Sequence, residues 1–188
     1  MRCFVAIPLP DDLRAALEAA QLRLRAAAPS ADVRWVSASG MHLTLAFLGQ
    51  VTDERAVAVA VALGTVAART PPFALECAGL GVFPGPSRPR VIWAGITAGL
   101  GDLGALAAGV ERALEPLGFA PEKRPFRGHV TLGRARSPRG VAPIARSLEA
   151  TRFGTWQVAE VVLYQSHLSP KGARYEPLAS LRLAGTVA

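Results

Sequence analysis

A short pattern that occurs twice constrains the fold of this chain more than any other feature. A histidine followed two residues later by a threonine lies in an apolar stretch at His42-Leu43-Thr44-Leu45, and the pattern returns at His129-Val130-Thr131-Leu132. Side chains in a β-strand alternate between its two faces, so each histidine shares a face with its threonine while the intervening residues point into a core. Two such strands facing each other across a cleft would offer two imidazoles to one substrate.

The sequence around the two motifs repeats at a larger scale as well. From the start of an apolar strand to the histidine there are 39 residues in the first case (Cys3 to His42) and 38 in the second (Val91 to His129). A helical apolar pattern lies between strand and histidine each time. This agreement indicates an internal duplication with a pseudo-two-fold axis.

The duplication predicts one domain over residues 1–188, with halves of approximately 1–83 and 91–188 and a Pro/Gly-rich hinge at 84–89. The order of strands and helices favours an α+β fold. We expect two pseudo-symmetric lobes, each an antiparallel sheet with outer helices, around a central catalytic cleft.

Apolar periodicity and turn residues predict the remaining elements. Helices are expected from Asp11 to before Pro29, from Thr52 to before Pro71, from Asp102 to about Leu117 and from Val141 to Ala150. Strands are expected at 2–7, 33–36, 41–48, 73–82 (bulged at Gly79 and Gly81), 91–96, 156–165 and 175–183, with a turn at Ser169–Gly172. On the second helix, Val57, Val61 and Val66 are expected to face inward, and on the third helix the inward residues are expected to be Leu103, Leu106, Val110 and Leu114.

Charge and cysteine content bear on the partners. The net charge is +7, and the segment from Lys123 to Arg146 holds seven basic residues and no acidic one. These arginines could simply keep a surface loop soluble, but their position beside the second motif favours an anionic substrate. Cys3 and Cys77 share no metal or redox spacing, which predicts buried thiols in a reducing cytoplasm. No apolar run approaches the roughly 20 residues of a membrane span.

Three kinds of chemistry could use the two histidines. A metal site needs three or four ligands, and neither His167 nor the carboxylates have ligand spacing. A nucleophilic triad lacks the strand-turn-helix context around Ser39 or Ser166. Paired general acid and base catalysis needs neither metal nor cofactor, since imidazole can take or give a proton near neutral pH. The pair suits in-line displacement at phosphorus, with threonine hydroxyls and arginines on the phosphate.

With these motifs the chain resembles the 2H phosphoesterase superfamily, and most closely its RNA 2′,3′-cyclic phosphodiesterase branch, historically called 2′-5′ RNA ligase. The resemblance rests on both HxTx motifs and on their surroundings. These are Arg2-x-Phe4-Val5-Ala6-Ile7, Trp35-Val36, Ala46-Phe47-Leu48-Gly49, Arg124-Pro125-Phe126-Arg127, Arg134 and Ser166-x-Leu168-x-Pro170-x-Gly172-x-x-Tyr175.

The resemblance implies metal-independent hydrolysis of RNA 2′,3′-cyclic phosphate ends to 2′-phosphates. It implies that His42 is the proton donor and His129 the proton acceptor. Thr44 and Thr131 would hold the phosphate. The same resemblance adds Arg134, and its neighbour Arg127, as substrate-binding residues; His167 is expected at the surface or rim.

Three alternatives remain open at the level of sequence. They are reversible 2′-5′ RNA ligation, a small cyclic-nucleotide phosphodiesterase, and non-catalytic RNA binding by the arginines. Trp35, Phe47, Phe126 and Tyr175 are candidates for stacking on a base. We expect a cytoplasmic monomer whose partner is RNA.

Overall fold

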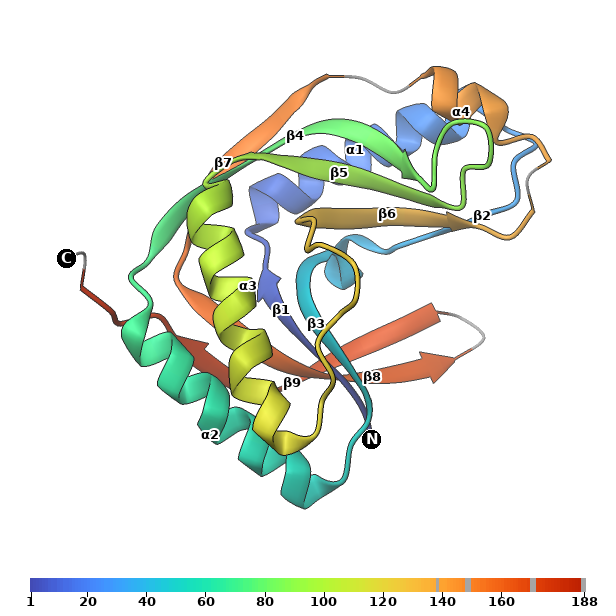
Figure 1. The fold of residues 1–188 in the computed structure, drawn as a ribbon. Coiled ribbons are helices and arrows are strands. Elements are labelled where there is room, and N and C mark those ends of the chain that lie inside the picture. Colours follow the sequence, from blue (N-terminus) through green and yellow to red (C-terminus); the bar gives the residue numbers. More distant parts are fainter. Residues whose placement is uncertain (138, 148–149, 170–171, 187–188) are drawn as a thin grey trace.

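The computed structural model describes residues 1–137, 139–147, 150–169 and 172–186 (Figure 1). Strands and helices alternate along the chain, as apolar periodicity predicts. In order they are β1 (Arg2–Pro8), α1 (Asp11–Ala27), β2 (Val33–Trp35), β3 (His42–Gln50), α2 (Asp53–Arg69), β4 (Phe73–Phe83), β5 (Val91–Ala98), α3 (Leu100–Leu114), β6 (His129–Ala135), α4 (Ala142–Arg146), β7 (Arg152–Val158), β8 (Glu160–Ser169) and β9 (Gly172–Arg182). Short 3₁₀ turns lie at Ala38–Gly40 and Glu115–Leu117.

The strands form two lobes that continue into one curled sheet. Its order in the described residues is β7-β4-β5-β6-β3-β1-β8-β9, and β2 also pairs with β6. We call β7, β4, β5, β6 and β2 the upper lobe, and β3, β1, β8 and β9 the lower lobe, after their places in Figure 1. The mixed fold with two antiparallel lobes is therefore confirmed. Each lobe takes strands from both ends of the chain.

The two motif strands are neighbours rather than opposing walls, which corrects the arrangement expected from sequence. β3 and β6 pair antiparallel at Leu43 and Val130, and this pair joins the two lobes. Both side chains are fully buried. The strands meet here because their apolar residues share one core. We call this contact between β3 and β6, at Leu43 and Val130, the seam.

The helices cover the outer side of the lobes. α1 packs against β7 and α4, while α2 lies beside α3 and against β8 and β9 (Figure 1). The inward residues expected for α3 are confirmed, since Leu103, Leu106, Val110 and Leu114 are buried. None of the helices in the described ranges combines the length and apolar character that crossing a membrane requires.

The inward face expected for α2 is wrong at two positions. Val57 and Val61 are 66% and 68% exposed, and Val66 is only partly buried. The helix instead buries the side that carries Ala56, Val59, Leu63 and Ala67. The expectation followed the larger valine side chains. The buried side of α2 includes two alanines, Ala56 and Ala67, and these small side chains allow the helix to approach its neighbours closely.

Three further elements differ in extent from expectation. The strand expected at 156–165 is two strands, β7 and β8, that join different lobes. The bulge in β4 occurs at Gly79, whose φ is +74°, whereas Gly81 pairs regularly with Trp93. α4 ends at Arg146, and residues 148–149 and 170–171, parts of the expected helix and turn, lie outside the described residues.

A buried glutamine ties the first helix to the seam. Gln21 on α1 is 4% exposed, and its side-chain amide donates 2.7 Å hydrogen bonds to the carbonyls of Val36 and Leu132. Val36 precedes the 3₁₀ turn that leads to His42, and Leu132 follows Thr131 on β6. The glutamine therefore fixes the backbone beside both motifs.

Candidate active site

The seam gathers the four motif side chains. Because antiparallel partners run in opposite directions, the Leu43–Val130 pair puts Thr131 next to His42 and Thr44 next to His129. All four are partly exposed, on the face opposite the buried residues. The expectation that each histidine shares a face with its threonine is therefore met within a single surface.

The two imidazoles are held in the same way. Nδ1 of His42 lies 2.8 Å from the carbonyl oxygen of Gly40, and Nδ1 of His129 lies 2.8 Å from that of Arg127. A carbonyl can only accept, so each Nδ1 carries the hydrogen and donates it. Each neutral ring is then left with an unprotonated Nε2 that can accept a proton from, or return one to, a substrate.

The surroundings of the two rings differ sharply. Phe4 stacks on His42 at 4.6 Å between ring centroids, and Tyr175 meets it edge-on at 5.0 Å. Burial among these rings lowers the pKa of His42 from 6.5 to about 4, although the hydrogen bond to Gly40 acts in the opposite direction. The charge of His129 lowers the His42 pKa further, so the two rings lie within electrostatic reach of each other.

His42 therefore departs from the sequence-based picture of two equivalent imidazoles. With a pKa near 4 it is neutral at pH 7 in the free protein. Once protonated, a ring of low pKa is a strong proton donor. His129 lies in a more open setting, where Phe83 meets it edge-on at 5.3 Å.

A bulge returns Arg134 to the histidine face. Strict alternation would put Arg134 on the side opposite His129 and Thr131. However, β5 pairs Trp93 with Thr131 and Ile92 with Gly133, so Leu132 has no partner there and the alternation shifts by one residue. The Arg134 guanidinium lies close enough to Tyr175 to lower the pKa of that phenol, against the larger raising effect of burial.

The first motif has a matching bulge. β1 pairs Ala6 with Thr44 and Val5 with Ala46, so Leu45 is skipped and Phe47 comes onto the face of Thr44. The Phe47 ring is 72% exposed and lies 6.3 Å from Phe4, the residue that stacks on His42. Of the expected stacking candidates, Phe47 therefore offers the most open aromatic surface near the histidines.

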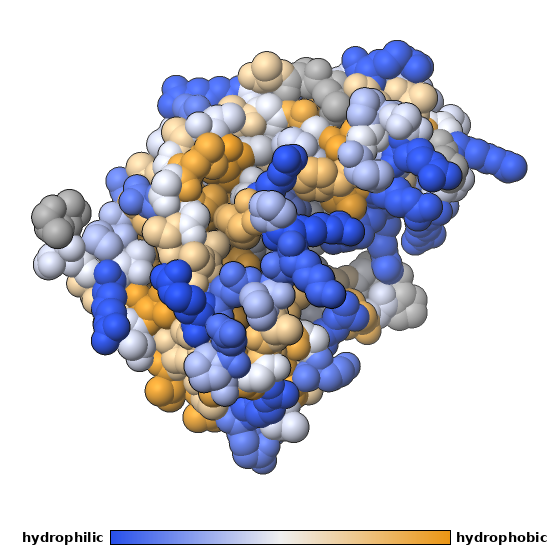
Figure 2. Space-filling model, viewed as in Figure 1, coloured by the Kyte–Doolittle hydropathy of each residue, from blue (hydrophilic) through white to orange (hydrophobic). Residues whose placement is uncertain are grey.

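The other expected residues lie around this centre. Arg127 orients His129 through its carbonyl, and its side chain borders a cavity beside that histidine. Trp35 instead carries the guanidinium of Arg25 over its ring, 5.4 Å from the centroid. Hydrophilic side chains border the notch between the lobes in the space-filling view (Figure 2).

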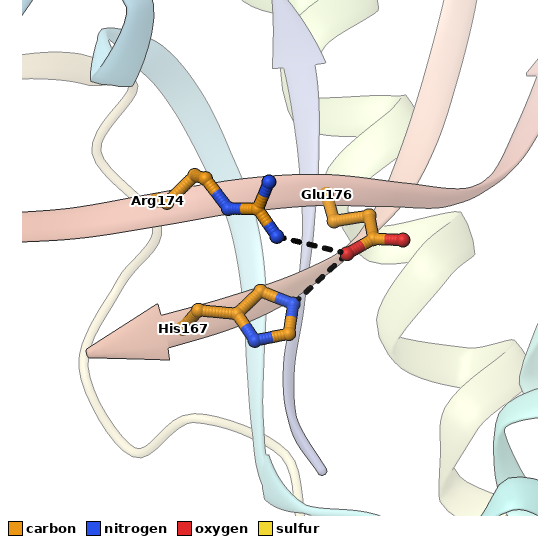
Figure 3. A network of polar contacts seen from close by, with 3 residues as sticks. All are labelled: His167, Arg174 and Glu176. Carbon is orange, nitrogen blue, oxygen red and sulfur yellow. Dashed lines mark hydrogen bonds and ion pairs between the residues drawn. The ribbon is translucent and has the colours of Figure 1, made fainter. Parts of the chain in front are cut away.

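The third histidine belongs to a separate network. On the β8–β9 hairpin, Nε2 of His167 lies 3.0 Å from Oε2 of Glu176, and Arg174 lies 3.5 Å from the same oxygen (Figure 3). The side chain of His167 is 39% exposed. It occupies the surface, as expected. Within the described residues, no group of three or more His, Cys, Asp or Glu side chains is arranged to hold a metal ion.

Sequence reasoning missed the aromatic residues that frame the histidines. Phe4 and Phe83 contact His42 and His129, and Trp93 stacks on Phe83. The signal for Phe4 was its alternation with Ala6 on a strand pairing with the first motif. No local signal ties Phe83 to His129, because that contact depends on the register of β4, β5 and β6.

Paired HxT motifs on neighbouring strands of a curled two-lobed sheet define a two-histidine phosphoesterase. The family described as LigT-like phosphoesterase matches residues 7–93 and 97–175. This chain belongs to that family.

Relatives cover nearly the whole chain. An RNA 2′,3′-cyclic phosphodiesterase of Archaeoglobus fulgidus is 36% identical over 95% of this chain and 98% of its own length. One from Thermus thermophilus is 37% identical over 98% of this chain and 91% of its own. Among solved structures, TT0787 of Thermus thermophilus matches with a TM-score of 0.84 at 34% identity, covering 98% of this chain and 99% of its own. E. coli LigT complexed with 3′-AMP matches at 0.76 and 31% identity, covering 97% of each chain.

Proposed function

We propose that this chain hydrolyses RNA 2′,3′-cyclic phosphate ends to 2′-phosphates by paired general acid and base catalysis that uses no metal. The observation that carries the proposal is the matched pair of imidazoles, each donating Nδ1–H to a carbonyl two residues earlier and each leaving Nε2 for the substrate. The names of the curated relatives supply the substrate class.

The two proton transfers use one histidine from each lobe, His129 on β6 of the upper lobe and His42 on β3 of the lower lobe. Nε2 of His129 accepts a proton from water as the water oxygen attacks phosphorus. The bond from phosphorus to the ribose 3′ oxygen breaks on the opposite side, and His42 gives that oxygen its proton. The bond to the 2′ oxygen stays, so the product is a 2′-phosphate. Such in-line transfer needs an acid and a base on opposite sides of phosphorus.

The low pKa of His42 suits the role of acid. An imidazolium of pKa about 4 gives up its proton more readily than one at 6.5. The free protein holds little of this form at pH 7, so the anionic cyclic phosphate must bind together with a proton. The phosphate charge then favours the protonated ring in the site.

The remaining residues bind the phosphate and the nucleoside. Thr44 and Thr131 present hydroxyls beside the two rings, and Arg134 adds a fixed positive charge from the second bulge. Arg134 stabilises the charge that builds on the non-bridging oxygens. Phe47 lies on the His42 side, where the ribose of the leaving 3′ oxygen is held, and its open ring can stack on the terminal base.

One experiment separates this function from its alternatives. The wild-type chain is given RNA ending in a 2′,3′-cyclic phosphate and, separately, 2′,3′-cyclic mononucleotides, each with and without EDTA. We expect 2′-phosphate ends, faster turnover of the RNA and no effect of EDTA. Activity that EDTA abolishes and a divalent ion restores would reject the metal-free mechanism. RNA binding without turnover would leave only a binding protein.

A further inference from the structure

Two arginines lie directly opposite each other on the neighbouring strands β2 and β6. Arg34 pairs with Arg134 in a regular antiparallel register, and side chains of directly opposite residues lie on the same face of a sheet. Arg34 therefore shares the histidine face with Arg134. Trp35, the next residue, points to the other side, where the guanidinium of Arg25 on α1 lies 5.4 Å from the centre of its ring. Arg34 is thus a second exposed cation on the substrate side of the sheet, and the hydrolysis described above gives it no role.

The two arginines reach across the notch towards the lower lobe. A guanidinium nitrogen of Arg34 lies 3.5 Å from the carbonyl oxygen of Ser169, at the end of β8. The charge of Arg134 acts on the phenol of Tyr175, on β9. The ends of β2 and β6 face the β8–β9 hairpin in Figure 1, and hydrophilic side chains border the notch in Figure 2. This end of the notch therefore carries two neighbouring positive charges.

Such a pair of like charges favours an anion between them. Like charges directly opposite on paired strands destabilise a sheet, and an anion held between them offsets that cost. Asp32, the acidic residue closest in sequence to Arg34, lies 3.9 Å from Arg136, so its charge also serves a third arginine. A phosphate group suits the place between Arg34 and Arg134, because a guanidinium can hold two phosphate oxygens at once.

The place of Arg34 along β6 indicates which phosphate it meets. β2 and β3 pair with the same edge of β6, because β5 occupies the other edge. Arg34 therefore lies on the edge of His42, where the departing 3′ oxygen and the terminal ribose are held. That ribose carries the rest of the RNA on its 5′ oxygen. Three residues of β6 separate Thr131, beside His42, from Arg134, or about 10 Å, so the phosphate on the 5′ oxygen is the first one beyond the reacting phosphate that can reach Arg34.

We propose that Arg34 makes the enzyme select RNA ends over free cyclic nucleotides. Together with Arg134 it binds the phosphate that joins the terminal nucleotide to the nucleotide before it. The proposal rests on the proposed function, including the assignment of His42 as the acid. Arg34 contacts none of the reacting atoms, so it determines specificity for the longer substrate and moves no proton.

The test compares two substrates that differ by a single phosphate. They are adenosine 2′,3′-cyclic phosphate and the same compound with a phosphate on its 5′ oxygen. The measurements give kcat and KM for each substrate with the wild-type chain, with Arg34→Gln and with Arg174→Gln. Arg174→Gln is the matched control, because it removes the same charge from an exposed arginine on the other face of β9, beside Glu176 (Figure 3).

We expect the wild type to favour the 5′-phosphorylated substrate by at least about tenfold in kcat/KM, which is what one charge-assisted hydrogen bond contributes. The preference should come from KM and should shrink as salt is added, because it is electrostatic. In Arg34→Gln the preference should fall below about threefold, while kcat/KM for adenosine 2′,3′-cyclic phosphate stays within about twofold of the wild type. Arg174→Gln should keep the wild-type preference.

A second measurement needs no variant and covers the case in which Arg34→Gln folds poorly. The wild type is given a diadenosine substrate that ends in a 2′,3′-cyclic phosphate and carries either an ordinary phosphate or a neutral methylphosphonate between its two nucleosides. The neutral linkage offers no charge to the two arginines, so kcat/KM should fall to the level of adenosine 2′,3′-cyclic phosphate.

Four results would overturn the role of Arg34 while leaving hydrolysis intact. The wild type could show no preference for the 5′-phosphorylated substrate, or the preference could survive Arg34→Gln. Arg34→Gln could slow both substrates equally, which would assign Arg34 to the reacting phosphate. The neutral linkage could be accepted as well as the charged one. A wild-type chain that consumes neither these substrates nor a longer RNA end would instead reject the proposed function.

Discussion

Removing the ring of Tyr175 should raise the pKa of His42. The value of about 4 in place of 6.5 corresponds to a cost of about 3 kcal/mol for charging the ring, at 1.36 kcal/mol per unit. Two aromatic rings lie closest to His42, the face of Phe4 and the edge of Tyr175, and the ring of Tyr164 lies farther away at 6.3 Å. Tyr175→Ala opens the side of His42 that the Tyr175 edge covers to water. We expect it to recover about one pKa unit, or roughly 1.4 kcal/mol.

The assay is an NMR titration of the imidazole nitrogens, with His42 identified by its loss in a His42→Asn variant. Tyr175→Phe is the control, because it keeps the ring and should leave the His42 pKa near 4. Inorganic phosphate should raise the wild-type value, since a bound anion favours the charged ring. A wild-type His42 that titrates near 6.5, or a Tyr175→Ala variant that titrates like the wild type, would refute burial as the cause.

Three further outcomes test the site. His42→Ala and His129→Ala should each slow turnover by about 10²–10⁴. The double variant should be slowed by less than the product of the two single effects. A single variant with near wild-type turnover would remove that histidine from the mechanism. In His129→Ala, kcat/KM should fall tenfold per pH unit above about pH 4, because only the proton on His42 still limits it; a flat profile from about pH 5 to 8 would contradict the assignment of His42 as acid. Replacing Arg136 and Arg139 with Ala should raise KM for an oligonucleotide and flatten its salt dependence while sparing a cyclic mononucleotide, and equal effects on both substrates would mean that these arginines do not track the RNA backbone.

The local pattern of the sequence predicted most of the helices and strands and placed each motif histidine on one face with its threonine. Apolar spacing in α3 gave its buried face, because a helix repeats every 3.6 residues whatever it packs against. Alternation likewise put His42 with Thr44 and His129 with Thr131, because two residues span one period of a strand. The same reasoning failed for α2, where apolar residues occupy more than one side and the packing partner decides which side is buried.

Properties that depend on partners across strands were decided by the tertiary structure. The bulges at Leu45 and Leu132 bring Phe47 and Arg134 onto the histidine face, and a bulge exists only in relation to the strand it pairs with. The contact between the two motif strands at Leu43 and Val130 likewise depends on how β3 pairs with β6.

The inequality of the two histidines has the same origin. Their local sequences are nearly alike, and both rings are oriented by the same backbone hydrogen bond. Phe4 and Tyr175, which come from the two ends of the chain, pack against the His42 ring, and burial of that ring is the main cause of its lowered pKa. Sequence alone thus predicted the two imidazoles as the groups that exchange protons with the substrate. The fold decided that His42 is the imidazole that binds its proton weakly, because desolvation depends on every residue that surrounds the ring.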